Sequence, residues 1–234
     1  MRSELFKWSR TVGAAWVSFF LAAGAAWAGP PLVCHPFDIG DAKSLPWVSH
    51  DWKLDGSESY DTQHLARDTA ALLDRNPKTA LVHMETLRRA TLYARKDPQA
   101  AKQLLLRLTA RAEAEQNLPH PNPLTVFDAG YLAETYKQWL GDGGENPAYG
   151  LNGYALVKKA LELTSGDPQM EFAAALITLR GPQAEHAGHA AKAIAGAKTD
   201  KELARNLATH FLGPESETMA EMITRNQPSK EGRP

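Results

Sequence analysis

The chain has 234 residues, of which 43% are hydrophobic and 23% are charged, and its formal net charge is −1. This composition is that of an ordinary globular protein, without the basic excess of a nucleic-acid-binding protein, so we expect no nucleic acid among its partners. The single cysteine, Cys34, excludes an internal disulfide, so the fold must be held by its hydrophobic core.

The first 28 residues have the features of an export signal. Three basic residues lie within the first ten, and an uncharged, largely apolar run over residues 11–28 ends in a small-x-small triplet at Ala28. This order predicts a signal peptide over residues 1–28, and hence a periplasmic or secreted protein with no membrane span after cleavage. The alternative is an uncleaved anchor, because the uncharged run approaches the ~20 residues of a membrane span.

Residues 29–61 form a loop-like segment with an unusual amount of apolar surface. The segment contains four prolines, and its large apolar side chains include Phe37, Leu45, Trp47, Val48, Trp52 and Tyr60. Because so much aromatic surface is not left in water, we expect an extended N-terminal arm packed on the rest of the protein. Cys34 is expected to be a buried small hydrophobe, a capped thiol or an intermolecular partner.

Helical periodicity dominates from residue 62 onward, and no stretch shows the alternation typical of strands, so the predicted class is all-α. Asp-Pro, Asn-Pro and Gly-Pro pairs separate the helices, because Asp or Asn caps the free amides and proline suits the first helical position. The expected arrangement is one α-helical domain over residues 62–226, an irregular, repeat-like array of antiparallel helical hairpins that is tetratricopeptide-like or a bundle, followed by a disordered tail over residues 227–234. The predicted helices cover residues 62–75, 77–95, 98–115, 123–140, 152–164, 168–180, 183–195, 200–212 and 215–225.

Arg88 is the most unusual residue of the predicted helix over residues 77–95. With about 100° of rotation per residue, it falls beside Met84 on the apolar side of that helix. Glu85 and Arg89 point away from that side and are expected to form an exposed pair. An arginine that is buried needs a carboxylate partner.

Two carboxylates are candidates for the partner of Arg88. Asp128 lies on the apolar face of the fourth predicted helix, and Glu171 lies on the close-packing side of the sixth. One interpretation is that Arg88 with Asp128 or Glu171 is a buried ion pair that fixes how the helices dock. The other is that Arg88, lined by Tyr131 and Tyr136, binds a carboxylate or phosphate of a ligand.

The sequence contains no motif that identifies a cofactor or a metal site. Glu185, His186 and His189 have a spacing that can chelate a metal, but they share the polar side of their helix with Lys192, which favours a solvated face. Zinc-protease, nucleophile-elbow, phosphate-loop and dinucleotide-binding patterns are absent from the sequence. We therefore expect no cofactor and no metal.

Two hypotheses about function remain open, and the sequence leaves uncertain whether the chain is an enzyme. The first is an exported α-helical binding or assembly module whose helices present a groove to a peptide or another protein. The second is an α-helical periplasmic hydrolase or lyase with a site between the N-terminal arm and the helices, using His35, His50 or Asp51 with Arg88. The two differ in whether these side chains meet in an open cleft or are sealed in the core.

Overall fold

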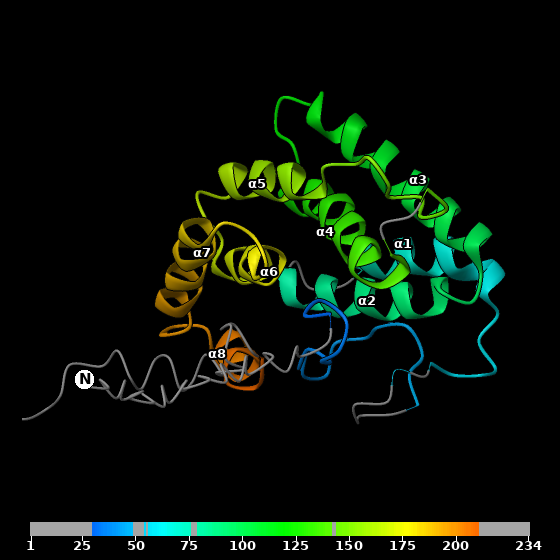
Figure 1. The fold of residues 1–234 in the computed structure, drawn as a ribbon, viewed down its shortest axis with the longest axis horizontal. Helices are drawn as coiled ribbons and strands as arrows, with labels where there is room; N and C mark the ends of the chain where they lie inside the picture. Colours follow the sequence, from blue (N-terminus) through cyan, green and yellow to red (C-terminus); the bar gives the residue numbers. More distant parts are fainter. Residues whose placement is uncertain (1–29, 49–53, 55, 76–78, 142–143, 211–234) are drawn as a thin grey trace, which may run out of the picture.

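The computed structural model describes residues 30–48, 54, 56–75, 79–141 and 144–210, and these residues confirm the predicted all-α class. No strand occurs among them, although Trp47 and Gly56 form an isolated antiparallel bridge. Figure 1 shows the elements, which in chain order are η1 (Thr62–His64), α1 (Leu65–Arg75), α2 (Ala80–Ala94), α3 (Pro98–Gln116), α4 (Pro123–Leu140), α5 (Gly153–Leu163), α6 (Pro168–Thr178), α7 (Gln183–Gly196) and α8 (Lys201–Thr209).

Three helices begin at the prolines that the sequence singles out. The side chains of Asp97, Asn122 and Asp167 each accept a hydrogen bond from a backbone amide in the first turn of α3, α4 and α6. Each cap is followed directly by proline, whose missing N–H costs nothing at that position. The predicted starts of these three helices are therefore confirmed.

The predicted start of α2 at residue 77 is wrong. Thr79 has an extended backbone (φ −117°, ψ 136°), so the first helical turn forms only after it, at Ala80. The Thr79 side chain makes no capping bond, and the amide of Leu81 donates instead to Gln169 Oε1 on α6, at 2.9 Å. The predicted signal peptide, the helix over residues 215–225 and the tail over residues 227–234 lie outside the described residues.

Helix α4 occupies the centre of the fold. It packs against α2, α3, α5 and α6, while α6 in turn packs against α7 and α8 (Figure 1). The two most extensively packed pairs of consecutive helices are α4 with α5 and α6 with α7, whereas α1 packs on both α2 and α3. The hydrophobic core therefore extends along α4 and α6 rather than within the α2–α3 pair.

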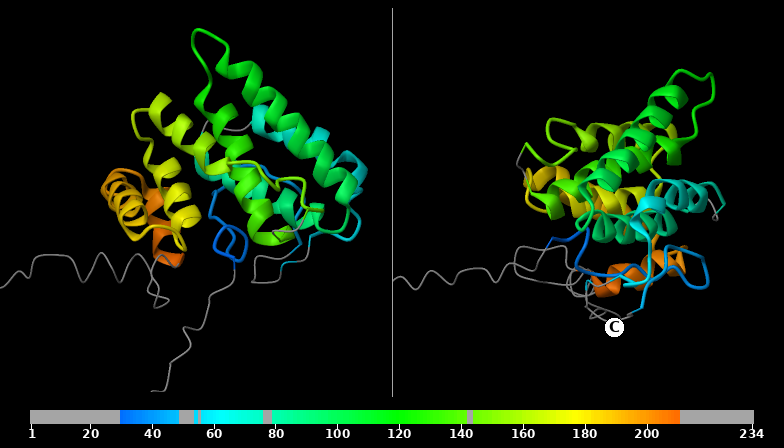
Figure 2. Two further views of the ribbon diagram at one scale, coloured as in Figure 1. Left: turned by 45° about the horizontal axis from the view of Figure 1, so that its top comes forward. Right: turned by 90° about the vertical axis from the view of Figure 1, so that its right-hand side faces the viewer.

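Residues 30–48 are packed against the helices although they form no regular structure. Leu32, Val33, Phe37 and Leu45 are buried. The segment passes close to α8, the last described helix, on one side of the molecule, as both views of Figure 2 show. Its contacts with helices far away in sequence make it part of the core.

The connection between α4 and α5 is held by one buried asparagine. Asn146 Nδ2 donates to the carbonyl oxygen of Tyr136 at 3.1 Å and also to that of Gly141, while Asn146 Oδ1 accepts from the amide of Ala148 at 2.9 Å. Asn146 is only 5% exposed. The described part of the connection between α4 and α5 is thus fastened to the end of α4.

Among the helices of the described residues, none combines the length and the apolar character that crossing a bilayer requires.

The crossing of α4 and α5 allows a test of this packing. A Cβ atom on Gly130 of α4 would lie 2.6 Å from the carbonyl oxygen of Gly153 and 2.8 Å from Leu156 Cβ on α5. Gly130→Ala should therefore lower the unfolding free energy by about 1–3 kcal/mol in chemical denaturation. Gly188→Ala on exposed α7, where no atom lies within 4 Å, should instead raise it by up to about 1 kcal/mol. Equal effects of the two changes would contradict the close α4–α5 crossing.

Candidate functional site

Arg88 is buried, and its carboxylate partner lies on its own helix. Arg88 Nε donates to Glu85 Oε2 at 2.8 Å, and Glu85 also pairs with Arg89, whose Nε lies 2.7 Å from Glu85 Oε1. The side chain of Glu85 is 0% exposed and that of Arg88 is 2% exposed. One fully buried carboxylate thus pairs with the guanidinium groups of two adjacent residues on α2.

This geometry corrects two predictions. Asp128 and Glu171 are not the partners of Arg88, and Glu85 does not point into solvent. The reason is that residues 30–48 cover the side of α2 that an isolated helix would leave exposed: Phe37 N donates to Glu85 Oε2 at 2.9 Å. Nearly every residue of α2 is buried, so a helical-wheel projection that assigns the helix one buried and one exposed face does not apply to it.

The two arginines bind the backbone of the segment that covers them. Arg88 Nη1 donates to the carbonyl oxygen of Val33 at 3.1 Å, and Arg89 Nη1 donates to that of Leu45 at 2.7 Å. The Trp47 ring lies against both guanidinium groups, 5.3 Å from Arg88 Cζ and 6.0 Å from Arg89 Cζ. With Glu85, the Val33 carbonyl and the Trp47 ring as neighbours and almost no exposure, Arg88 cannot reach a substrate from this position.

Tyr131 and Tyr136 do not line an open pocket with Arg88. Both are fully buried, and Tyr136 donates to the carbonyl oxygen of Ala101 at 3.3 Å. Burial raises the pKa of Tyr131 well above its ordinary value, with a further increase from the nearby Glu85 carboxylate and an opposing decrease from Arg88. Tyr131 is therefore near the ion-pair cluster, but its hydroxyl makes no hydrogen bond to any described residue.

Asp128 pairs with His83, a residue that the sequence did not connect with it. His83 Nδ1 lies 2.7 Å from Asp128 Oδ1, and both side chains are buried. Because a carboxylate can only accept, His83 Nδ1 carries the proton of this bond. A cavity of about 90 Å³ is lined by both residues, together with others that include Asp74, Arg111 and Thr125.

Glu171 belongs to a separate chain of polar side chains that joins α5, α6 and α7. Its Oε2 accepts from His189 Nδ1, and its Oε1 accepts from Lys192 Nζ at 2.8 Å. His189 Nε2 then meets the Tyr154 hydroxyl at 2.7 Å. Burial, and next the neighbouring Glu185 carboxylate, raise the pKa of Tyr154 to about 12, so its hydroxyl remains protonated and donates.

The weak metal candidates serve other contacts. His186 Nδ1 lies 3.0 Å from the carbonyl oxygen of Ala175, while His189 is occupied by Glu171 and Tyr154. Within the part of the chain that the structure describes, no three His, Cys, Asp or Glu side chains come together in a group that could hold a metal ion.

The histidine of the predicted arm that the structure describes, His35, lies in an aromatic cluster. Its ring centroid is 5.4 Å from that of His210, and His210 stacks on Phe37 at 4.6 Å. Burial, with smaller electrostatic contributions from His35 and Arg88, lowers the pKa of His210 to about 3. His50 and Asp51, the other candidates for a hydrolytic site at the arm, lie outside the described residues.

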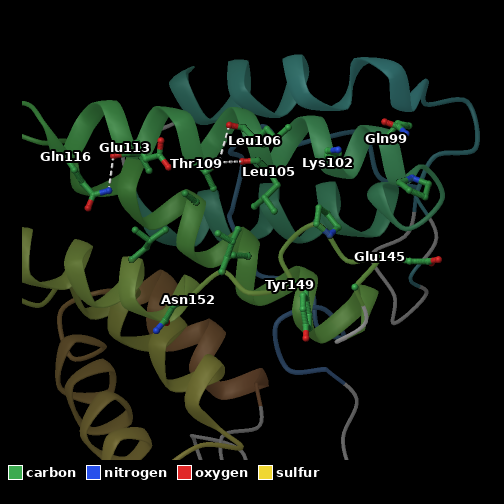
Figure 3. Close-up of a pocket in the computed structure, with 18 residues that line it drawn as sticks. Gln99, Lys102, Leu105, Leu106, Thr109, Glu113, Gln116, Glu145, Tyr149 and Asn152 are labelled. Carbon is green, nitrogen blue, oxygen red and sulfur yellow. Dashed lines mark hydrogen bonds between the residues drawn. The ribbon is translucent and has the colours of Figure 1, made fainter.

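A groove of about 800 Å³ lies between α3 and the connection from α4 to α5. Leu105 and Thr109 of α3 lie along one side of it, and Tyr149 and Asn152 lie along the other (Figure 3). Its floor includes small residues, among them Ala129 of α4. A floor of small side chains lets an apolar group approach the helices closely.

Exposed apolar side chains concentrate at this groove. Leu106, Tyr149 and Leu151 are 58%, 66% and 39% exposed, and all three line it. The α3 residues of the lining recur at heptad spacing, so they form a stripe along the whole helix; they are Pro98, Gln99, Lys102, Leu105, Leu106, Thr109, Ala112, Glu113 and Gln116. The sequence signal for this stripe is Leu106, which lies outside the buried side of α3.

No protein-family model matches the chain, and no curated protein or solved structure matches it either.

Removing either side of the buried ion pair should strongly destabilise the fold. Glu85→Gln should lower the unfolding free energy by about 3–5 kcal/mol, because it leaves buried Arg88 without its carboxylate. Arg88→Ala should also lower it, but by less, because buried Glu85 then keeps Arg89 as its ionic partner. Thermal and chemical denaturation measure this loss. Lys159→Ala, which removes the exposed Lys159–Glu162 pair, is the control and should leave the melting curve almost unchanged. An unchanged melting curve for Arg88→Ala would contradict a structural role of the pair.

His210 should make stability depend on pH. Its pKa falls from 6.5 to about 3 on folding, so between these values the unfolded chain binds a proton that the folded chain does not. Its stabilising contribution is complete above pH 6.5 and is lost as the pH falls toward 3, at about 1.4 kcal/mol per pH unit. The unfolding free energy, measured by urea denaturation at several pH values in this range, should depend less steeply on pH for His210→Phe than for the unchanged protein. Parallel slopes would show that His210 is protonated in the folded state.

Proposed function

We propose that the chain is an exported binding module, acting in the periplasm or outside the cell, whose groove along α3 takes a helical segment of a protein partner. The observation that carries this proposal is the clustering of exposed Leu106, Tyr149 and Leu151 around the groove of about 800 Å³. The scaffold would be the expected irregular array of helical hairpins with its N-terminal arm. The closely packed α4–α5 and α6–α7 pairs support that description.

The shape of the groove favours a helix over a compact ligand. The lining stripe follows all 19 residues of α3, a length of about 28 Å. Side chains at heptad spacing are the surface that a second helix meets when it lies along the first. Lys102, Glu113 and Glu145 supply charges of both signs to the lining, so the occupant should carry an apolar face flanked by charges of both signs.

The hydrolase or lyase hypothesis requires Arg88 to be available at a site between the N-terminal arm and the helices. Arg88 is committed to Glu85 and to the carbonyl oxygen of Val33, and its side chain is 2% exposed. A catalytic group must contact the substrate, so Arg88 does not support a site between the arm and the helices. This supports the binding module.

A displayed library of amphipathic helices with randomised apolar faces would test the groove. Selection on the purified protein should enrich peptides whose affinity, measured by fluorescence anisotropy, falls at least tenfold with Leu106→Glu or Tyr149→Glu, because each places a charge in the apolar contact. Leu118→Glu is the matched control, since Leu118 is 52% exposed just beyond α3 and does not line the groove. Failure to enrich any peptide, or an equal loss with Leu118→Glu, would contradict the proposal.

A further inference from the structure

The residues of α3 that line the groove include a regular stripe on the protein surface. Its members alternate at intervals of three and four residues, and they are Gln99, Lys102, Leu106, Thr109, Glu113 and Gln116. With about 100° of rotation per residue, all six fall on one face of α3. Thr109 is partly exposed and the other five are exposed, so this face is available to a second helix.

The order of residues along the stripe is self-complementary when the helix direction is reversed. Matching the residues from the two ends gives the pairs Gln99 with Gln116, Lys102 with Glu113, and Leu106 with Thr109. The three pairs share one midpoint, between residues 107 and 108. A two-fold axis through that midpoint would bring amide to amide, ammonium to carboxylate, and the Leu106 side chain to the Thr109 methyl group.

The two charges of the stripe cannot neutralise each other within one chain. Lys102 and Glu113 lie about 16 Å apart along the axis of α3, because each residue adds about 1.5 Å. Neither forms an ion pair with another described residue. In an antiparallel pair of α3 helices, Lys102 meets Glu113 of the partner subunit, and this happens twice. A parallel pair in register would place like charges together at both positions, so the charges select the antiparallel arrangement.

The opposite wall of the groove would complete the contact. A helix that lies in the groove has α3 on one side and Tyr149 on the other (Figure 3). Leu151 also lines the groove, and with Leu106 and Tyr149 it would be covered in both copies of a two-fold dimer. The groove requires an occupant with an apolar centre and charges of both signs, and α3 itself has Leu106 between Lys102 and Glu113.

We propose that the protein partner of the groove is a second copy of this chain, and that the two copies form a two-fold symmetric dimer in which their α3 helices pair antiparallel. This inference rests on the function proposed for the groove and names its occupant. A contact limited to one helix and one loop is smaller than the ~1,600 Å² of a standard interface, so monomer and dimer should exchange at micromolar concentrations.

Sedimentation velocity of the purified protein between about 1 and 200 µM tests the dimer. Lys102→Glu and Glu113→Lys should each raise the dimer Kd at least about tenfold, because each places like charges opposite one another in both pairs. The double variant should return to within about threefold of the unchanged Kd, because the exchanged charges again meet their opposites. The distance between the two residues within one chain means that only contact between copies can produce this restoration.

Lys198→Glu is the matched control for charge reversal. Lys198 is exposed just beyond α7 and does not line the groove, so its reversal should leave the Kd unchanged. All these substitutions lie at exposed positions, and circular dichroism should show the same helix content in every variant. The inference is overturned if the unchanged protein is monomeric at about 200 µM, if the dimer withstands the single reversals, or if the double variant dimerises no better than the single ones.

The outcome for the dimer can be separated from the outcome for the groove. A chain that stays monomeric, yet binds a selected amphipathic helix in a way that depends on Leu106, overturns self-pairing alone. A chain that neither dimerises nor binds any helix overturns both proposals. A dimer that the single reversals weaken and the double reversal restores supports both.

Discussion

The Glu85 carboxylate, fully buried on α2, accepts hydrogen bonds from Arg88, from Arg89 and from the backbone amide of Phe37. Removing a carboxylate from water costs several kcal/mol unless opposite charges and hydrogen bonds surround it. Two of these partners lie on the same helix, but the third belongs to residues 30–48. Burial of α2 and docking of that segment therefore require each other, and neither arrangement is stable without the other.

The same constraint extends from α2 to the rest of the chain. An irregular segment has no ladder to satisfy its backbone, so side chains of the helices must do so. The amide of Leu32 donates to Gln138 Oε1 on α4, and Asn206 of α8 bonds both the amide and the carbonyl oxygen of Asp38. Residues 30–48 thus connect helices that are far apart in sequence, and the polar groups of those helices specify one docked position.

Local signals in the sequence predicted local structure well. Asp97 and Asn122 cap helices where the Asp-Pro and Asn-Pro pairs indicate, because a cap involves only the neighbouring amides. Pairing of buried polar groups was predictable only in part. The helical periodicity places Arg88 on the buried side of α2 but places its partner Glu85 on an exposed side. That side is buried in the structure because residues 30–48, which are distant in sequence, cover it. The partner of Asp128, His83, lies 45 residues away, and only the packing of α2 on α4 brings the two together.

Helix α4 explains why the candidate sites are distinct although they share a scaffold. Its successive residues face different neighbours: Asp128 faces His83 and the small cavity, Ala129 faces the groove along α3, and Gly130 faces α5. Since one step along a helix turns the side chain by about 100°, adjacent residues serve different surfaces. A change at the groove can therefore leave the buried His83–Asp128 pair intact, although both surfaces are built on the same helix.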